Sequence, residues 1–177
     1  MENLFTHQII VSRHVKKYLT VVYGETYHLS QKESIGISIL NFLQKDFKMI
    51  DYDMKELDHS KKVFYPVTFS YNVFKNQGHS ISHKENVIIG DLLDKYFREQ
   101  MYTFTLLHAM GKKTHWKDCM KKFLKIFDIN DDDFDLESFY KDFRRKKNEN
   151  SHNPISNLNK HLIENECLSV VRVLSHS

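Results

Sequence analysis

The sequence predicts a mainly α-helical protein, a compact array of about three helix-loop-helix pairs, and leaves open a short terminal strand pair. Apolar residues recur at helical spacing along most of the chain. Serine-led helix starts occur twice, and the 177 residues include only 5 Gly and 2 Pro. A hydrophobic share of 41% and an aromatic share of 13% exclude a chain that is disordered throughout.

The first predicted pair spans residues 8–44. Apolar residues at helical spacing predict a helix over 12–23, and Gly24 stands where a helix C-terminus is expected. Ser30 is followed three residues later by Glu33, which is the capping-box pattern that opens a second helix.

The second and third pairs are predicted over 66–100 and 115–147. The start of a helix at Ser82, with Glu85 three residues later, repeats the pattern of the first pair. Residues 64–74 alternate like a strand but also fit a helix that begins at Pro66, and the repeat favours the helix. The similarity leaves two explanations open, a true duplication or reuse of one capping solution.

These pairs predict a helical domain over 1–147, followed over 148–177 by a linker and a C-terminal helix or strand. No stretch approaches the roughly 20 apolar residues that span a bilayer, and the N-terminus lacks the pattern of a signal peptide. The two cysteines give no disulfide framework. We therefore expect a cytoplasmic protein without a membrane partner.

Metal sites are not expected. His115 and Cys119 have the spacing of two ligands on one helix face, as do His79 and His83, but no further ligand motif accompanies either pair. The acidic run over 128–135 lacks the glycine and the final glutamate of a calcium-binding loop. It instead suits the start of a helix capped by an aspartate.

Catalytic motifs are also missing from the sequence. There is no Gly-x-Ser-x-Gly nucleophile motif, no Walker A loop and no dinucleotide fingerprint. We expect a non-enzymatic protein that uses no cofactor and has no small-molecule substrate.

Two basic clusters with aromatic residues remain as a candidate binding surface. Their members are Lys112, Lys113, Trp116, Lys117, Lys121, Tyr140, Lys141, Arg144, Arg145, Lys146 and Lys147. Lysine and arginine neutralise phosphates, and Trp116 or Tyr140 can stack on an unpaired base. Two simpler readings stay open, because cations at a helix C-terminus complement its dipole and regularly spaced lysines form a solvated stripe. The aromatic content also permits a protein-binding module.

The two Ser-x-Lys-Glu helix starts and the Phe-Tyr-Lys-Asp-Phe-Arg-Arg segment over 139–145 resemble small accessory and regulatory proteins of bacterial phages and mobile elements. The resemblance covers about half of the chain. It implies a regulator that binds DNA or RNA in the bacterial host cell. As an alternative it implies a phage-encoded inhibitor of the anti-CRISPR type, whose partner is a bacterial ribonucleoprotein that serves as an RNA-guided defence effector.

Overall fold

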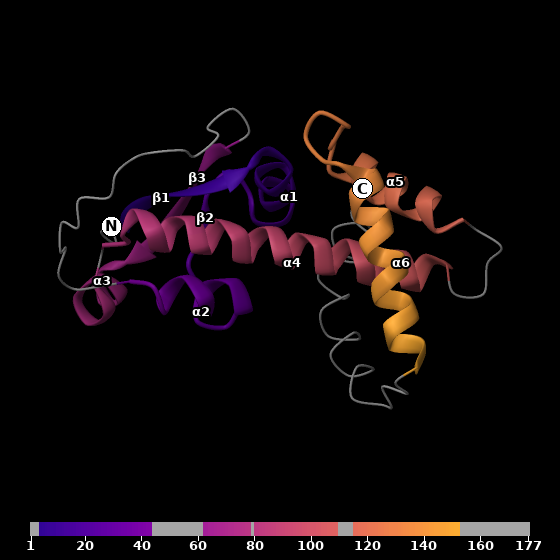
Figure 1. Ribbon diagram of the computed structural model, residues 1–177. Helices are drawn as coiled ribbons and strands as arrows, with labels where there is room; N and C mark the ends of the chain where they lie inside the picture. The colour runs from indigo at the N-terminus through magenta and orange to yellow at the C-terminus, as the bar shows by residue number, and fades with distance from the viewer. Residues whose placement is uncertain (1–3, 44–61, 79, 110–114, 153–177) are drawn as a thin grey trace. The chain divides into compact units, whose positions relative to one another are not determined.

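The computed structural model describes residues 4–43, 62–78, 80–109 and 115–152 (Figure 1). The chain divides into two compact units, Met1–Phe97 and Arg98–Ser177, and the boundary falls within one long helix. Helices predominate, which confirms the mainly α class. The predicted strand or helix over 168–174 lies outside the described residues.

The first unit contains a three-stranded sheet and helices. In chain order its elements are β1 (Leu4–Ser12), α1 (Arg13–Tyr23), β2 (Tyr27–His28), α2 (Ser34–Leu40), β3 (Lys62–Ser70), α3 (Tyr71–Gln77) and the first part of α4 (His83–Ala109). The strand order is β1-β3-β2, with β1 antiparallel and β2 parallel to β3. At the middle of the β1–β3 ladder, Gln8 lies opposite Pro66.

The predicted helix over 64–74 is wrong for residues up to Ser70, and the strand alternative is right. Alternate side chains of β1 and β3, among them Ile9 and Val67, are buried against the helices of this unit. In a strand every second side chain points to the same face, so pairing β1 with β3 buries one apolar face of both strands. The free energy of this burial favours the strand over the helix in the ambiguous segment. Because both of the first two predicted pairs contain a strand, the arrangement in three helix-loop-helix pairs is not confirmed.

The first unit repeats one order of elements. A strand, a serine N-cap, a helix and a glycine stop occur first with Ser12 and Gly24, then with Ser70 and Gly78. Both glycines adopt a positive φ, 91° and 102°, which favours glycine. The antiparallel register of β1 and β3 is symmetric about its central pair, and a helix follows directly after each strand.

Only one of the two predicted capping boxes forms. The Ser82 N–H donates to Glu85 Oε2 at 2.8 Å, and the Glu85 N–H donates to Ser82 Oγ at 3.3 Å. The predicted box at Ser30 is wrong, because α2 begins only at Ser34. The Glu33 carboxylate instead accepts a hydrogen bond from the Tyr27 hydroxyl at 2.7 Å, which takes it away from the Ser30 backbone.

The second unit consists of the rest of α4 together with α5 (Trp116–Ile126) and α6 (Leu136–His152). Aromatic side chains join the helices, since the rings of Phe104 and Phe123 lie 5.3 Å apart. Asp135 caps α6 as predicted, because the Ser138 N–H donates to Asp135 Oδ1 at 3.0 Å. The helix continues to His152, past the predicted end at 147. In the described part of the chain, no helix has the length and apolar content needed to cross a membrane.

Candidate nucleic-acid interface

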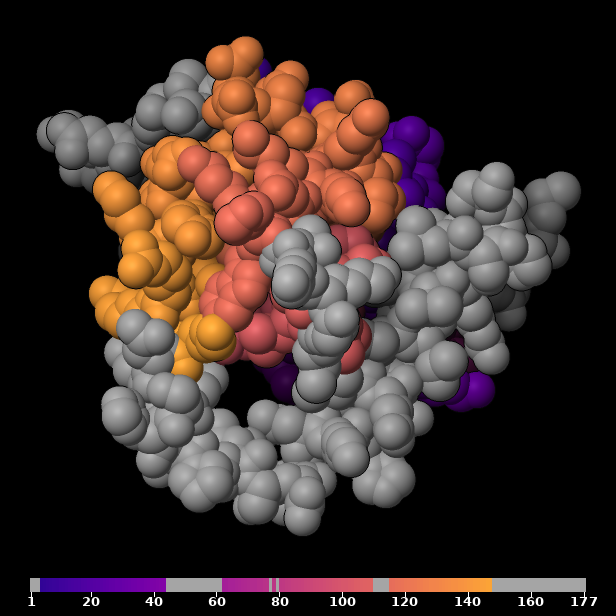
Figure 2. Space-filling view, turned by 90° about the vertical axis from the view of Figure 1, so that its right-hand side faces the viewer, coloured from indigo at the N-terminus to yellow at the C-terminus, as the bar shows by residue number. Residues whose placement is uncertain are grey.

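Helices α5 and α6 pack against each other and bring lysines together with aromatic rings. Trp116 and Lys117, at the start of α5, contact residues 137–147 of α6. The acidic loop over 128–135 joins the end of α5 to the start of α6. Trp116 therefore lies beside Lys147, late in α6, whereas Lys117 lies beside Glu137, which follows the acidic loop by two residues. Figure 2 shows both helices on one face of the molecule, coloured from coral to yellow.

Trp116 is the centre of this arrangement. Its ring packs edge-on against the buried Phe143, with centroids 4.8 Å apart and an interplanar angle of 87°. The Lys147 ammonium lies 3.4 Å from the Trp116 ring centroid, in cation–π contact. The indole is thus fixed by the core on one side and carries a cation on the other, and it remains half-buried.

Lys117 joins the same cluster from the next position of α5. Its Nζ forms an ion pair with Glu137 and lies 6.0 Å from the Tyr140 ring centroid. The carboxylate offsets part of the lysine charge. Tyr140 is half-buried, so part of its ring remains accessible beside the ammonium.

Tyr102 of α4 is a member of the cluster that sequence reasoning missed. Its ring centroid lies 4.9 Å from that of Phe143 and 4.8 Å from the Lys146 ammonium. In the sequence it belongs to an apolar stretch over 101–107 that favours core. Nothing in the sequence separates Tyr102 from its apolar neighbours; in the structure it lies one position after the fully buried Met101, which turns it toward a neighbouring helix face.

The remaining predicted site residues lie outside this cluster of lysines and aromatic rings. Lys141 and Arg144 are exposed on α6, and the exposed Arg145 pairs with Asp142 at 3.1 Å. Lys121 lines a separate hollow beside the acidic loop. Lys112 and Lys113 lie outside the described residues.

The structure therefore unites three predicted lysines and both predicted aromatic rings with one further side chain, Tyr102. We call this set the lysine–aromatic face; it comprises Tyr102, Trp116, Lys117, Tyr140, Lys146 and Lys147.

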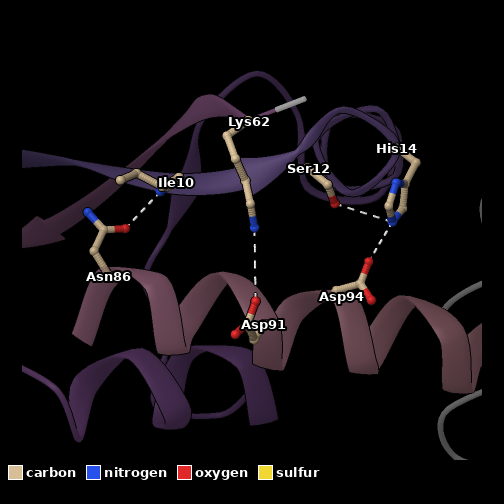
Figure 3. Close-up of polar contacts among 7 residues, drawn as sticks. All are labelled: Ile10, Ser12, His14, Lys62, Asn86, Asp91 and Asp94. Atoms are coloured by element: carbon tan, nitrogen blue, oxygen red, sulfur yellow. Dashed lines mark hydrogen bonds and ion pairs between the residues drawn. The ribbon is translucent and has the colours of Figure 1, made fainter. Parts of the chain in front are cut away.

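A serine, a histidine and an aspartate meet in the first unit, but their geometry does not fit a catalytic triad (Figure 3). His14 Nε2 lies 3.2 Å from Ser12 Oγ and 2.6 Å from Asp94 Oδ1. A catalytic histidine uses one ring nitrogen for the nucleophile and the other for the acid, whereas both partners here share Nε2. The contact instead ties α4 to the start of α1.

No metal centre emerges among the residues that the structure describes, because no three His, Cys, Asp or Glu side chains group as ligands. Cys119 is buried. Comparison with protein-family models, with curated proteins and with solved structures found no match to this chain. The functional interpretation of the lysine–aromatic face therefore rests on its geometry alone.

Proposed function

We propose that this chain is a non-enzymatic regulatory protein that binds nucleic acid through its lysine–aromatic face. The observation that carries the proposal is the Lys147 ammonium against the ring of Trp116, beside two more lysine–ring contacts. Single-stranded nucleic acid offers the matching chemistry, because bases stack on aromatic rings while the adjacent phosphates meet cations.

The side chains support a simple binding step. When Lys147 swings from Trp116 to a phosphate, the ring face becomes available to an unpaired base, and the ammonium stays close to the backbone it neutralises. The exposed Lys141 and Arg144 extend the positive path along α6. Glu137 beside Lys117, together with the acidic loop that precedes it, repels phosphate at that margin of the face, so the site is short.

The test is a titration of the full chain with labelled single-stranded DNA and RNA, followed by fluorescence anisotropy across a range of salt. Three phosphate contacts predict a slope of about −2 in log K against log salt, since each contact contributes about −0.7. Trp116 is the single tryptophan, so its emission should change on binding. Lys147→Gln should weaken binding and lower the slope by about 0.7.

The control variant is Lys95→Gln, which removes an exposed lysine of α4 that is outside the face. It should leave the affinity nearly unchanged. Absent or salt-independent binding, or an equal effect of the two variants, would contradict the proposal. A stable stoichiometric complex with a bacterial effector, without binding to free nucleic acid, would favour the inhibitor alternative instead.

A further inference from the structure

A hollow between α4 and α5, in the second unit, uses none of the residues of the lysine–aromatic face. Its volume is about 420 Å³, and it is lined by Phe104, His108, Lys122, Lys125 and Ile126. Small-molecule sites in proteins span about 300–1,000 Å³. The hollow therefore has the size of a site for a small ligand.

The inner wall of the hollow is apolar. Phe104 is 7% exposed, and its ring meets the Phe123 ring at a centroid distance of 5.3 Å. The His108 ring stacks on the Phe104 ring with centroids 3.8 Å apart, and His108 Nδ1 donates to the Phe104 carbonyl oxygen at 3.1 Å. Ile126 is half-buried and completes the wall. The core thus holds an apolar surface open at this point.

Two lysines supply positive charge at the mouth of the hollow. Lys122 and Lys125 are exposed, and their spacing of three positions puts them on the same side of α5. Lys125 also borders the neighbouring hollow that contains Asp128 and Asp131. Among the residues that the structure describes, however, neither lysine ammonium has an ion pair or a hydrogen bond. Both charges are therefore available to an anion.

The end of α5 does not occupy these two ammonium groups. Lysines late in a helix can bind its last carbonyls. Here the Leu124 carbonyl accepts from the Ile129 N–H at 2.9 Å, and the Lys125 carbonyl accepts from the Asp128 N–H at 3.2 Å. The loop backbone satisfies these carbonyls, and the lysine side chains are left for another partner.

We propose that this hollow binds a small carboxylate with an apolar body, such as a medium-chain fatty acid. The apolar body lies against Phe104 and Ile126, where its burial contributes most of the affinity. The carboxylate lies between Lys122 and Lys125 and forms charge-assisted hydrogen bonds with them. The ligand is bound and not chemically changed. This site goes beyond the nucleic-acid proposal and does not depend on it, because it uses other residues and another class of ligand.

The experiment is an NMR titration of the isotope-labelled full chain with octanoate and, separately, with 1-octanol, which has the same apolar body without the charge. Amide signals over 104–108 and 122–126 should shift. Octanoate should bind at least about 5-fold more tightly than 1-octanol, since it adds ion pairs with two exposed lysines. Lys122→Gln with Lys125→Gln should reduce the octanoate affinity to about that of 1-octanol. Ile126→Ala should weaken both ligands, because it removes part of the apolar wall.

The matched control is Lys95→Gln with Lys121→Gln, which removes two exposed lysines that do not line the hollow. It should leave the octanoate affinity nearly unchanged. Equal affinities for octanoate and 1-octanol, shifts confined to other residues, or an equal loss in the control would overturn the proposal. So would a dimer that the Lys122 and Lys125 variant dissociates without any binding of octanoate, because a second copy of the chain would then occupy the hollow.

The same variants separate this site from the lysine–aromatic face. The Lys122 and Lys125 variant should lose octanoate selectivity and keep its affinity for single-stranded nucleic acid, whereas Lys147→Gln should do the opposite. A Lys122 and Lys125 variant that loses nucleic-acid binding and retains octanoate selectivity would overturn the carboxylate site.

Discussion

Asn86 replaces a missing strand at the edge of the sheet. Its amide accepts a hydrogen bond from the Ile10 N–H at 2.7 Å and donates one to the Gln8 carbonyl at 2.9 Å. Asn86 is 8% exposed, so both bonds are largely shielded from water. Removal of this side chain should therefore test how α4 is held against β1.

We expect Asn86→Ala to lower the free energy of unfolding by about 2–4 kcal/mol. The change removes two hydrogen bonds and leaves a donor and an acceptor unpaired, and each group costs about 1–3 kcal/mol before water or local relaxation compensates. Urea denaturation measures the loss, and amide exchange should accelerate at Ile10. Asn86→Asp keeps the acceptor but sets a carboxylate against the Gln8 carbonyl, so it should cost at least as much.

The control is Asn72→Ala on α3, where the asparagine is exposed. It should change the free energy of unfolding by no more than about 0.5 kcal/mol. A loss below about 1 kcal/mol for Asn86→Ala, or unchanged exchange at Ile10, would refute the view that this side chain secures the strand edge.

Three more predictions concern the same unit. Gly90→Ala should lower the melting temperature, because the added Cβ would lie 2.3 Å from the Ile10 carbonyl oxygen; a melting temperature equal to that of the parent chain would argue against this close packing. Burial raises the pKa of Tyr65 from 10.0 to about 12, so its contribution to stability should fade as pH rises from about 10 to about 12. Tyr65→Phe should flatten that decline in urea titrations, and it should cost about 1 kcal/mol at neutral pH by losing the bond to the Gly24 carbonyl. Burial lowers the pKa of His7, so stability should fall as pH drops below about 6.5; His7→Phe should reduce this slope, and an equally steep slope would exclude His7 as its cause.

Local signals predicted the elements that depend on local contacts. The apolar spacing before Gly24 predicts α1, and the glycine stop is observed at that position. The Ser82–Glu85 box forms, whereas the Glu33 carboxylate accepts a hydrogen bond from the Tyr27 hydroxyl. The same sequence pattern therefore gives two results, and the difference lies in a tyrosine outside the pattern.

Pairing between distant segments was the part that sequence reasoning missed. In β1 the side chains of Phe5, His7, Ile9 and Val11 share one face, but this alternation produces a strand only when β1 pairs with β3, whose partner residues lie fifty or more positions away. In β3 the strand and helix patterns coincide at Val67, so local spacing alone could not decide. The prediction of the binding residues had the same limit. Which lysine lies against which aromatic ring depends on the packing of α5 against α6, and local sequence patterns do not show that packing.

Charge segregation changes what the formal net charge of +3 implies. Electrostatic interactions in water are screened over about 8–10 Å at physiological salt, so a bound phosphate senses nearby charges more than the total. On the lysine–aromatic face Lys117 is paired with Glu137, whereas Lys146 and Lys147 lie over aromatic rings. This face therefore acts with its local charge. The salt slope of binding should follow the number of cations in contact with phosphate and be insensitive to distant acids. An exposed acid such as Glu25, replaced by Gln, raises the net charge by one and should leave this slope unchanged.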